Sequence, residues 1–271
     1  MPALETHVSR VEELDVFCRS GEWSGTPTLY VHGVPTSSSD FVPFLAAAGG
    51  IAVDLPGFGR SAKPAGRAYV IAEYDLFLER FLDALALERV NLVVHDWGAA
   101  ALAFAQRRPE RIGRLVVINA VPLLPRYSWH PIAKLWRTPL VGEAMMALTT
   151  RSTARLLTRP ANVTAGPLPD AWIDETLATL DEGTKRAILR LYRSSPADVL
   201  AAAGRRLATI DAPALVAWGA RDPFIGLEFA YAYANALHAE LEILPDAGHW
   251  PWLDDPELVE RITGSSVQAD R

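Results

Sequence analysis

The feature that most constrains this chain is an abrupt change of pattern between Val90 and Leu102. An apolar, β-branched run ends at the dipeptide His95-Asp96, and an alanine-rich run begins directly after Gly98. The first run favours a buried strand and the second a helix, so the segment predicts a strand, a tight turn and a helix. Such a turn holds Asp96 at the strand tip and aims its side chain above the sheet. Taken alone, Asp96 is explained equally well as the N-cap of the helix, a position that favours carboxylates.

Strands and helices alternate on both sides of this segment. Residues 5–20 alternate apolar and polar positions around a turn, as an antiparallel hairpin at a sheet edge does. Helical periods, for example over residues 69–88, separate a series of apolar runs. The order predicts an α/β fold with a mostly parallel central sheet flanked by helices. The runs expected to form the strands after the hairpin are Thr28–Gly33, Gly50–Leu55, Val90–Val94, Arg114–Ala120, Pro213–Gly219 and Ala239–Leu244, of which Thr28–Gly33 and Arg114–Ala120 are typical of buried strands.

The alternation breaks after Ala120. Residues 121–207 contain no convincing strand but several helical patterns separated by proline and glycine. We expect this segment to be a helical cap inserted after the sixth strand, with residues 1–120 and 208–271 forming the core. The expected cap helices are Pro131–Leu148, Ser152–Leu157, Pro169–Leu180, Thr184–Tyr192 and Pro196–Leu207.

Composition narrows the partners that such a fold can have. Half of the 271 residues are hydrophobic and the net charge is −6, so one large core can form and no basic face favours nucleic acid. The single cysteine, Cys18, cannot build a disulfide framework or a cysteine-based metal site. No run approaches the roughly 18 apolar residues of a membrane span. We expect a cytoplasmic protein, a monomer or a homodimer, with no cofactor, metal, nucleic acid or membrane partner.

Three ionisable residues fall at the carboxyl ends of predicted strands: Asp96, Asp222 and His249. Ligands and catalytic groups of open α/β sheets lie at this edge. Each residue has an ordinary alternative explanation, since Asp222 precedes Pro223 in a turn-like sequence and a loop histidine can be structural. Their positions together, in the order nucleophile, acid, histidine, predict a catalytic triad.

With these motifs the chain resembles the aspartate-nucleophile branch of the α/β-hydrolase fold, which includes haloalkane dehalogenases and epoxide hydrolases. The resemblance covers nearly the whole chain and is specific in the core but loose in the cap. It implies the α/β-hydrolase fold, with Asp96 on the nucleophile elbow in place of the usual serine. The matching motifs are His32-Gly33-Val34-Pro35-Thr36-Ser37-Ser38, Asp54-Leu55-Pro56-Gly57-Phe58-Gly59-Arg60-Ser61, Val94-His95-Asp96-Trp97-Gly98, Gly219-Ala220-Arg221-Asp222-Pro223 and Gly248-His249-Trp250.

The resemblance implies a two-step hydrolysis of a small apolar organic substrate. A carboxylate is already ionised at neutral pH, so Asp96 can attack an sp³ carbon directly and form an alkyl ester. His249 then takes a proton from the water that hydrolyses this ester, while Asp222 orients and stabilises the imidazolium. The backbone N–H groups of Val34 and Trp97 are the expected oxyanion hole, and each such donor is typically worth ~3 kcal/mol.

Dehalogenation requires N–H donors aimed at the departing halide. Trp97 matches the indole donor that follows the nucleophile in haloalkane dehalogenases. The second donor is commonly an asparagine after His-Gly, where this chain has Val34, whose side chain cannot donate. A cap tryptophan can take that role or simply pack, and the candidates are Trp129, Trp136 and Trp172.

Epoxide opening instead requires an acid beside the leaving oxygen, typically two cap tyrosines. Tyr192 resembles the second of these in its distance from Asp222, although it also fits an ordinary amphipathic helix. The first has no clear match, because Leu135 occupies the likeliest position and Tyr127 comes too early in the chain.

The core motifs favour a haloalkane dehalogenase-like hydrolase over an epoxide hydrolase by a small margin. The segments around Thr36 and Asp96 resemble the dehalogenases, whereas Val34 and Gly248-His249-Trp250 resemble the epoxide hydrolases. A third hypothesis is a ligand-binding homologue that keeps the pocket without turnover.

Overall fold

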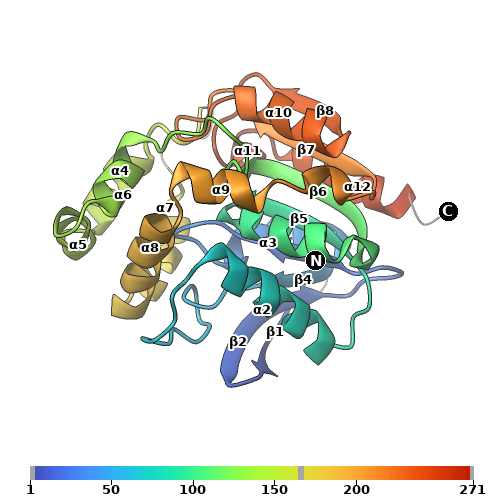
Figure 1. The fold of residues 1–271 in the computed structure, drawn as a ribbon, viewed down its shortest axis with the longest axis horizontal. Coiled ribbons are helices and arrows are strands. Elements are labelled where there is room, and N and C mark those ends of the chain that lie inside the picture. The colour runs from blue at the N-terminus through green and yellow to red at the C-terminus, as the bar shows by residue number, and fades with distance from the viewer. Residues whose placement is uncertain (1–3, 164–167, 269–271) are drawn as a thin grey trace.

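The computed structural model describes residues 4–163 and 168–268, and its centre is an eight-stranded sheet in the order β1-β2-β4-β3-β5-β6-β7-β8 (Figure 1). β1 and β2 form the expected antiparallel hairpin, and β2 also pairs antiparallel with β4. All further neighbours are parallel, which confirms the mostly parallel sheet predicted. The strands are β1 (Glu5–Val11), β2 (Leu14–Gly21), β3 (Thr28–Val31), β4 (Gly50–Val53), β5 (Val90–Asp96), β6 (Ile112–Ala120), β7 (Ala214–Gly219) and β8 (Glu240–Leu244).

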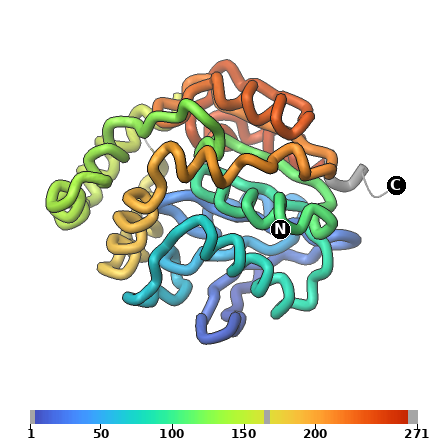
Figure 2. Tube along the Cα trace, in the orientation of Figure 1, coloured from blue at the N-terminus to red at the C-terminus, as the bar shows by residue number. Residues whose placement is uncertain are grey.

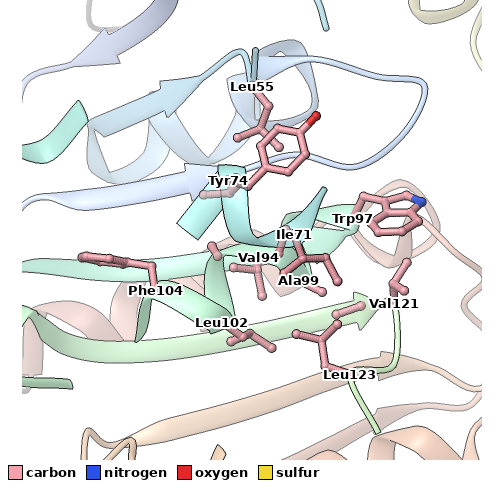
Figure 3. Packing of buried hydrophobic residues seen from close by; sticks show 14 of the residues in the cluster. Leu55, Ile71, Tyr74, Val94, Trp97, Ala99, Leu102, Phe104, Val121 and Leu123 are labelled. Atoms are coloured by element: carbon pink, nitrogen blue, oxygen red, sulfur yellow. The ribbon is translucent and has the colours of Figure 1, made fainter. Parts of the chain in front are cut away.

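The central strands are largely apolar and buried because both faces of the sheet are covered. Side chains alternate between the faces along each strand. In β5, Leu92 and Val94 therefore pack into one hydrophobic cluster and Val93 into another. Figure 3 shows the first cluster, in which Val94 lies among Ala99 and Leu102 of the segment after β5.

Helices cover each face of the sheet. On the face of Leu92 and Val94 lie α2 (Ile71–Ala84), α3 (Ala101–Arg107) and α10 (Glu228–Leu237). On the face of Val93 lie α1 (Val42–Ala48), α11 (Pro251–Asp254) and α12 (Glu257–Gln268). The two layers leave only the strand ends open, and this is where the polar residues after β5, β7 and β8 lie.

Of the six α-helices described between β6 and β7, the first five gather beyond one end of the sheet (Figure 1). The pattern over Pro131–Leu148 predicted one helix, and this prediction was wrong because the structure contains two. Pro139 disfavours helical geometry in the residue before it, and Thr138 is extended. Leu140 then adopts a positive φ of 68°, which turns the chain into the next helix. The five helices are α4 (Pro131–Arg137), α5 (Val141–Ala147), α6 (Arg151–Thr158), α7 (Asp170–Thr179) and α8 (Glu182–Ser194).

The chain returns from these helices to the core through α9 (Ala197–Ala203), part of the orange tube that runs beside the green helices of the core in Figure 2. Gln106 of α3 joins the two regions, because its Nε2 donates to the carbonyl of Ala203 at 2.8 Å. Its Oε1 accepts from the N–H of Arg206, also at 2.8 Å. We propose residues 121–207 as the cap, with its last turn anchored on the core by Gln106.

No helix within the described parts of the chain is long and apolar enough to span a membrane.

Candidate active site

Asp96 ends β5 in a strained conformation, with φ 48° and ψ −119°. One turn of 3₁₀ helix, Trp97–Ala100, follows and leads into α3. The Asp96 side chain makes no capping hydrogen bond to that turn, so the N-cap explanation was wrong. Gly98 is required here, because a Cβ atom would lie 2.1 Å from the carbonyl oxygen of Val31. The turn therefore holds the Asp96 carboxylate at the strand tip, free for another role.

Two backbone donors surround this carboxylate. The N–H of Val34 donates to Oδ1 of Asp96 at 2.8 Å, and the N–H of Trp97 faces the same group. Burial raises the pKa of Asp96, while His249 and these two N–H groups oppose the rise. The two donors lie where an oxyanion hole was predicted.

His249 follows β8 and faces Asp96 from the other side. It is 2% exposed; its Nε2 lies 3.6 Å from Oδ2 of Asp96, and its Nδ1 lies 2.7 Å from Oδ2 of Asp222. Burial alone would lower the pKa of His249, but the carboxylates of Asp222, Asp96 and Asp40 together raise it above its ordinary value. Because Nδ1 is bonded to Asp222, Nε2 is the ring nitrogen that remains available to accept a proton.

Asp222 is held by hydrogen bonds on both oxygens. Oδ2 accepts from Nδ2 of Asn119 at 2.7 Å in addition to the histidine. Oδ1 accepts from the N–H groups of Phe224 and Ile225 at 2.7 and 3.1 Å. These donors stabilise the ionised carboxylate and fix its orientation toward the imidazole. Asn119 was not predicted as a site residue, although it stands at the end of β6, where the same edge argument applies.

The backbone of His249 is held by partners from distant parts of the chain. Its N–H donates to the carbonyl of Ala161, in the segment after α6, at 2.7 Å. Its carbonyl lies 2.8 Å from Nε2 of His95. Because burial keeps the pKa of His95 well below its ordinary value, His95 is neutral and donates from this nitrogen. A cap residue and an elbow residue thus position the loop that carries the imidazole.

Asp254 of α11 ties the same two segments together. Its carboxylate accepts from the N–H of Gly248 at 2.8 Å and from the N–H of Val163 at 3.0 Å. This link was missed in the sequence, because an aspartate four residues beyond a Gly-His-Trp motif carries no signal of a contact with the cap.

The Asp96 carboxylate and the His249 ring open onto a largely apolar pocket between the sheet and the cap helices. Such a lining favours small apolar ligands. Within the described residues, no cluster of three or more histidine, cysteine or acidic side chains is arranged to hold a metal ion. The pocket lining includes Val34, Pro35, Val121, Tyr127, Trp129, His130, Trp136, Met146, Ile188, Tyr192, Phe224 and Trp250.

The four tryptophans considered as halide donors lie in different settings. The buried indole N–H of Trp97 has no partner within hydrogen-bond distance among the described residues, although it faces the Tyr192 hydroxyl closely enough to oppose the rise of that phenol's pKa. Trp97 is not among the pocket-lining residues, and Figure 3 shows its nitrogen pointing away from the labelled core side chains. Trp129 lines the pocket, but its N–H donates to the carbonyl of Ser195 at 3.0 Å and is already used. Trp136 also lines the pocket, whereas Trp172 packs against Trp250 outside the lining.

Two tyrosines reach the same pocket. The ring of Tyr192 stands edge-on to Trp97, with ring centres 5.2 Å apart. Tyr127 is buried with no hydrogen bond to its hydroxyl, and it lines the pocket although the sequence did not align it. Burial and then the charge of Asp96 raise the pKa of both phenols, so both stay protonated. Leu135, the position expected for the first tyrosine, is 45% exposed and lies outside the lining.

A carboxylate held on a strained strand-to-helix turn, with an oriented imidazole within reach, is characteristic of α/β-hydrolases. The comparisons with known proteins agree. A model described as "Alpha/beta hydrolase family" matches residues 29–262.

The similar proteins narrow the class. A haloalkane dehalogenase of Mycolicibacterium paratuberculosis is 32% identical to this chain. The alignment covers 96% of this chain and 88% of that protein. Haloalkane dehalogenase 1 of Mycobacterium tuberculosis is 34% identical, and the alignment covers 87% of this chain and 82% of that protein. The solved structure of haloalkane dehalogenase DbeA from Bradyrhizobium elkani matches with a TM-score of 0.85, 27% identity and 99% of each chain covered.

The chain therefore belongs to the α/β-hydrolase family, and it is similar in sequence and structure to the haloalkane dehalogenases. It is a hydrolase.

Proposed function

We propose that this hydrolase cleaves the carbon–halogen bond of a small apolar substrate through an alkyl ester of Asp96. One observation carries the proposal: Asp96 Oδ1 is held by the Val34 N–H, while Oδ2 faces the pocket 3.6 Å from the His249 imidazole. The names of the similar proteins support the choice of a halide as leaving group.

In the first step, Oδ2 of Asp96 attacks the carbon that bears the halogen. The new carbon–oxygen bond forms as the carbon–halogen bond breaks, and the halide leaves with the electron pair. The unbonded indole N–H of Trp97 is the donor that can stabilise this anion. Because the pocket excludes most water, the hydrogen bond to the halide is stronger than it would be in solution.

In the second step, Nε2 of His249 removes a proton from water, and the hydroxide attacks the ester carbonyl carbon of Asp96. The negative charge develops on Oδ1, where the N–H groups of Val34 and Trp97 stabilise it. Asp222 stabilises the imidazolium. The alcohol leaves, the carboxylate is restored, and the imidazolium releases its proton, so the net reaction converts haloalkane and water into alcohol, halide and a proton.

An epoxide is the second candidate substrate, and the two buried phenols favour it. The hydroxyls of Tyr127 and Tyr192 are both protonated and both within the electrostatic influence of Asp96. Either one can donate a proton to the alkoxide that forms when an epoxide ring opens. The ester intermediate and its hydrolysis by His249 would be unchanged.

Two assays separate these functions. Halide release from 1-bromobutane and 1,2-dibromoethane is compared with diol formation from styrene oxide, for the wild type and for Tyr192→Phe. We expect halide release that Tyr192→Phe largely retains. Diol formation alone, lost in Tyr192→Phe, would establish the epoxide hydrolase instead. A ligand that stabilises the protein in a thermal-shift screen, with no product in either assay, would point to binding without turnover.

The covalent intermediate has its own test. His249→Gln removes the base but leaves Asp96 able to attack, so the ester should accumulate. Intact-protein mass spectrometry after incubation with 1-bromobutane should show one added butyl group. The control is the double variant with Asp96→Ala, which should stay unmodified. An unmodified His249→Gln protein, made from a wild type that turns over, would exclude the two-step mechanism.

A further inference from the structure

Asp40 is a buried carboxyl group that the proposed reaction does not use. It lies in the 3₁₀ turn Ser38–Phe41, directly after the loop that supplies the oxyanion-hole donor, and it is 1% exposed. Among the described residues, no lysine or arginine forms an ion pair with it. Its Oδ1 has no partner within hydrogen-bond distance in this part of the chain, although the indole of Trp250 faces the carboxyl group. A buried carboxylate without a cationic partner is costly, so a neutral acid is the favoured form of such a group.

A short chain of hydrogen bonds connects Asp40 to the nucleophile. Oδ2 of Asp40 lies 2.6 Å from Oγ1 of Thr36, and this hydroxyl lies 3.2 Å from the carbonyl oxygen of Gly33. That carbonyl belongs to the same peptide group as the N–H of Val34, which donates to Asp96 at 2.8 Å. The carboxyl group, the hydroxyl, the peptide and the nucleophile are therefore linked in sequence.

The hydroxyl of Thr36 has one hydrogen and two acceptors beside it. When Asp40 is ionised, the hydrogen goes to the stronger acceptor, the carboxylate. The Gly33 carbonyl then loses this donor and keeps only the Nδ1–H of His32, which lies 2.7 Å away and is oriented by the Leu55 N–H on its other nitrogen. When Asp40 is a neutral acid, its own O–H donates to Thr36, and Thr36 donates to Gly33. A donor on the carbonyl oxygen polarises the peptide and strengthens the N–H on its other side.

We propose that Asp40 is a positioning residue of the oxyanion hole. As a neutral acid it directs the Thr36 hydroxyl onto the Gly33 carbonyl, and so strengthens the Val34 N–H that stabilises charge on Asp96. Ionisation of Asp40 withdraws this support and adds a negative charge near the developing oxyanion. The inference rests on the proposed function, since it concerns the hydrolysis of the Asp96 ester.

The ionisation falls in the range in which the enzyme would work. Burial raises the pKa of Asp40 to about 7, with the hydroxyl of Thr36 and the indole of Trp250 opposing the rise. The titratable groups that face Asp40 are Asp96, which raises its pKa further, and His249, which lowers it. His249 must be neutral to act as a base, so its protonation limits the reaction on the acid side, and Asp40 is expected to limit it on the basic side.

The test is the pH dependence of ester hydrolysis in single-turnover measurements with 1-bromobutane. We expect the wild-type rate to fall by about tenfold as the pH rises past about 7, because the oxyanion-hole donor is weakened but not lost. Asp40→Asn is neutral at every pH and keeps an N–H donor toward Thr36, so its rate should stay level up to pH 9. The acid limit should move to lower pH, because Asp40 no longer raises the pKa of His249. Asp246→Asn removes a 73% exposed carboxylate and should leave the wild-type profile intact.

Thr36 separates the hydrogen-bond relay from a simple charge effect. Thr36→Ser keeps the hydroxyl and should keep the wild-type profile, whereas Thr36→Val should lower the rate at its optimum toward the wild-type value at pH 9. If Asp40→Asn retains the basic decline, or if Thr36→Val retains the wild-type maximum, the proposal is overturned.

A second measurement needs no substrate and so distinguishes failure of this proposal from failure of the proposed function. Asp40 binds its proton more tightly in the folded state than in the unfolded state, so its ionisation destabilises the fold as the pH rises from about 4 to about 7. The melting temperature of Asp40→Asn relative to the wild type should therefore rise across this window. A difference that does not change with pH would show that Asp40 is already ionised in the folded protein, which contradicts the relay.

Discussion

The two sides of the pocket are built in different ways. On the core side, Asp96, Asp222 and His249 stand at one edge of the sheet, at or after the ends of β5, β7 and β8, and each is held by hydrogen bonds. On the cap side, aromatic rings such as Tyr192 and Trp136 meet edge to face and offer few polar atoms. Hydrogen bonds fix position and charge within narrow limits, whereas ring contacts mainly fix shape. The core side therefore suits the reaction, and the cap side suits the choice of substrate.

This difference predicts that substitutions on the two sides change different kinetic constants. A core-side change should lower kcat, because it removes an interaction made in the transition state. A cap-side change should mainly alter KM, because it changes binding that is equal in ground and transition states.

Asp96→Ala is expected to have the largest effect. It removes the nucleophile, so turnover should fall by about 10⁴-fold or more. Halide release from 1,2-dibromoethane measures the loss, and circular dichroism checks the fold. Substantial residual turnover would mean that water attacks the substrate directly and that the ester is not an intermediate.

Trp97→Phe comes next, since it removes the indole N–H but keeps an aromatic ring. The rate of ester formation should fall by about 10²-fold, as for the loss of one donor to a developing anion. Trp129→Phe is the matched control, because that N–H serves the Ser195 carbonyl, which Arg137 also contacts at 2.9 Å. We expect the control to cost about 1 kcal/mol of stability with little change in ester formation. If Trp97→Phe and Trp129→Phe slow ester formation equally, the Trp97 N–H has no special role in stabilising the halide.

Gly248→Ala tests whether the cap helps to position the imidazole. The new Cβ atom would lie 2.1 Å from the Ala161 carbonyl, so the loop before His249 must shift. We expect about 1–3 kcal/mol of destabilisation and a slower second step, measured by thermal unfolding and by accumulation of the ester. Gly66→Ala, where a Cβ atom meets nothing within 4 Å, should be neutral. An unchanged second step in Gly248→Ala would show that the loop tolerates the shift.

Met146→Leu should have the smallest effect. Met146 lines the cap side of the pocket and is buried, and the exchange conserves volume, so the stability cost should be below about 1.5 kcal/mol. KM for bromoalkanes of different length should change by a few fold while kcat stays constant. A larger change in kcat than in KM would contradict the division between the two sides.

The core could be predicted because its signals are local. Asp96 ends a strand, Asp222 and His249 come shortly after the ends of two others, and parallel strands bring their carboxyl ends to one edge. The sequence alone also allowed Asp96 to be the N-cap of the following helix. The structure excluded this role, because the Asp96 side chain makes no capping hydrogen bond.

The cap resisted prediction for the opposite reason. Its residues meet through contacts between helices that are distant in the sequence, such as Tyr192 with Trp97. Nothing near Trp129 reveals that its N–H is used by Ser195, and nothing near Tyr127 reveals that it reaches the pocket. Nothing near Asp40 in the sequence reveals its link to the oxyanion hole, because that link runs through the hydroxyl of Thr36.

The sequence by itself determined the parallel sheet, the elbow and the order of the acidic and basic groups along its edge, since these depend on periodicity and on the residue that follows each strand. The tertiary structure decided which polar atoms are already bonded, which remain free to meet a substrate, and how the cap segment at Ala161 supports His249. The physical reason is that hydrogen-bond donors and acceptors are satisfied by neighbours in space, and those neighbours are set by packing between segments far apart in the chain.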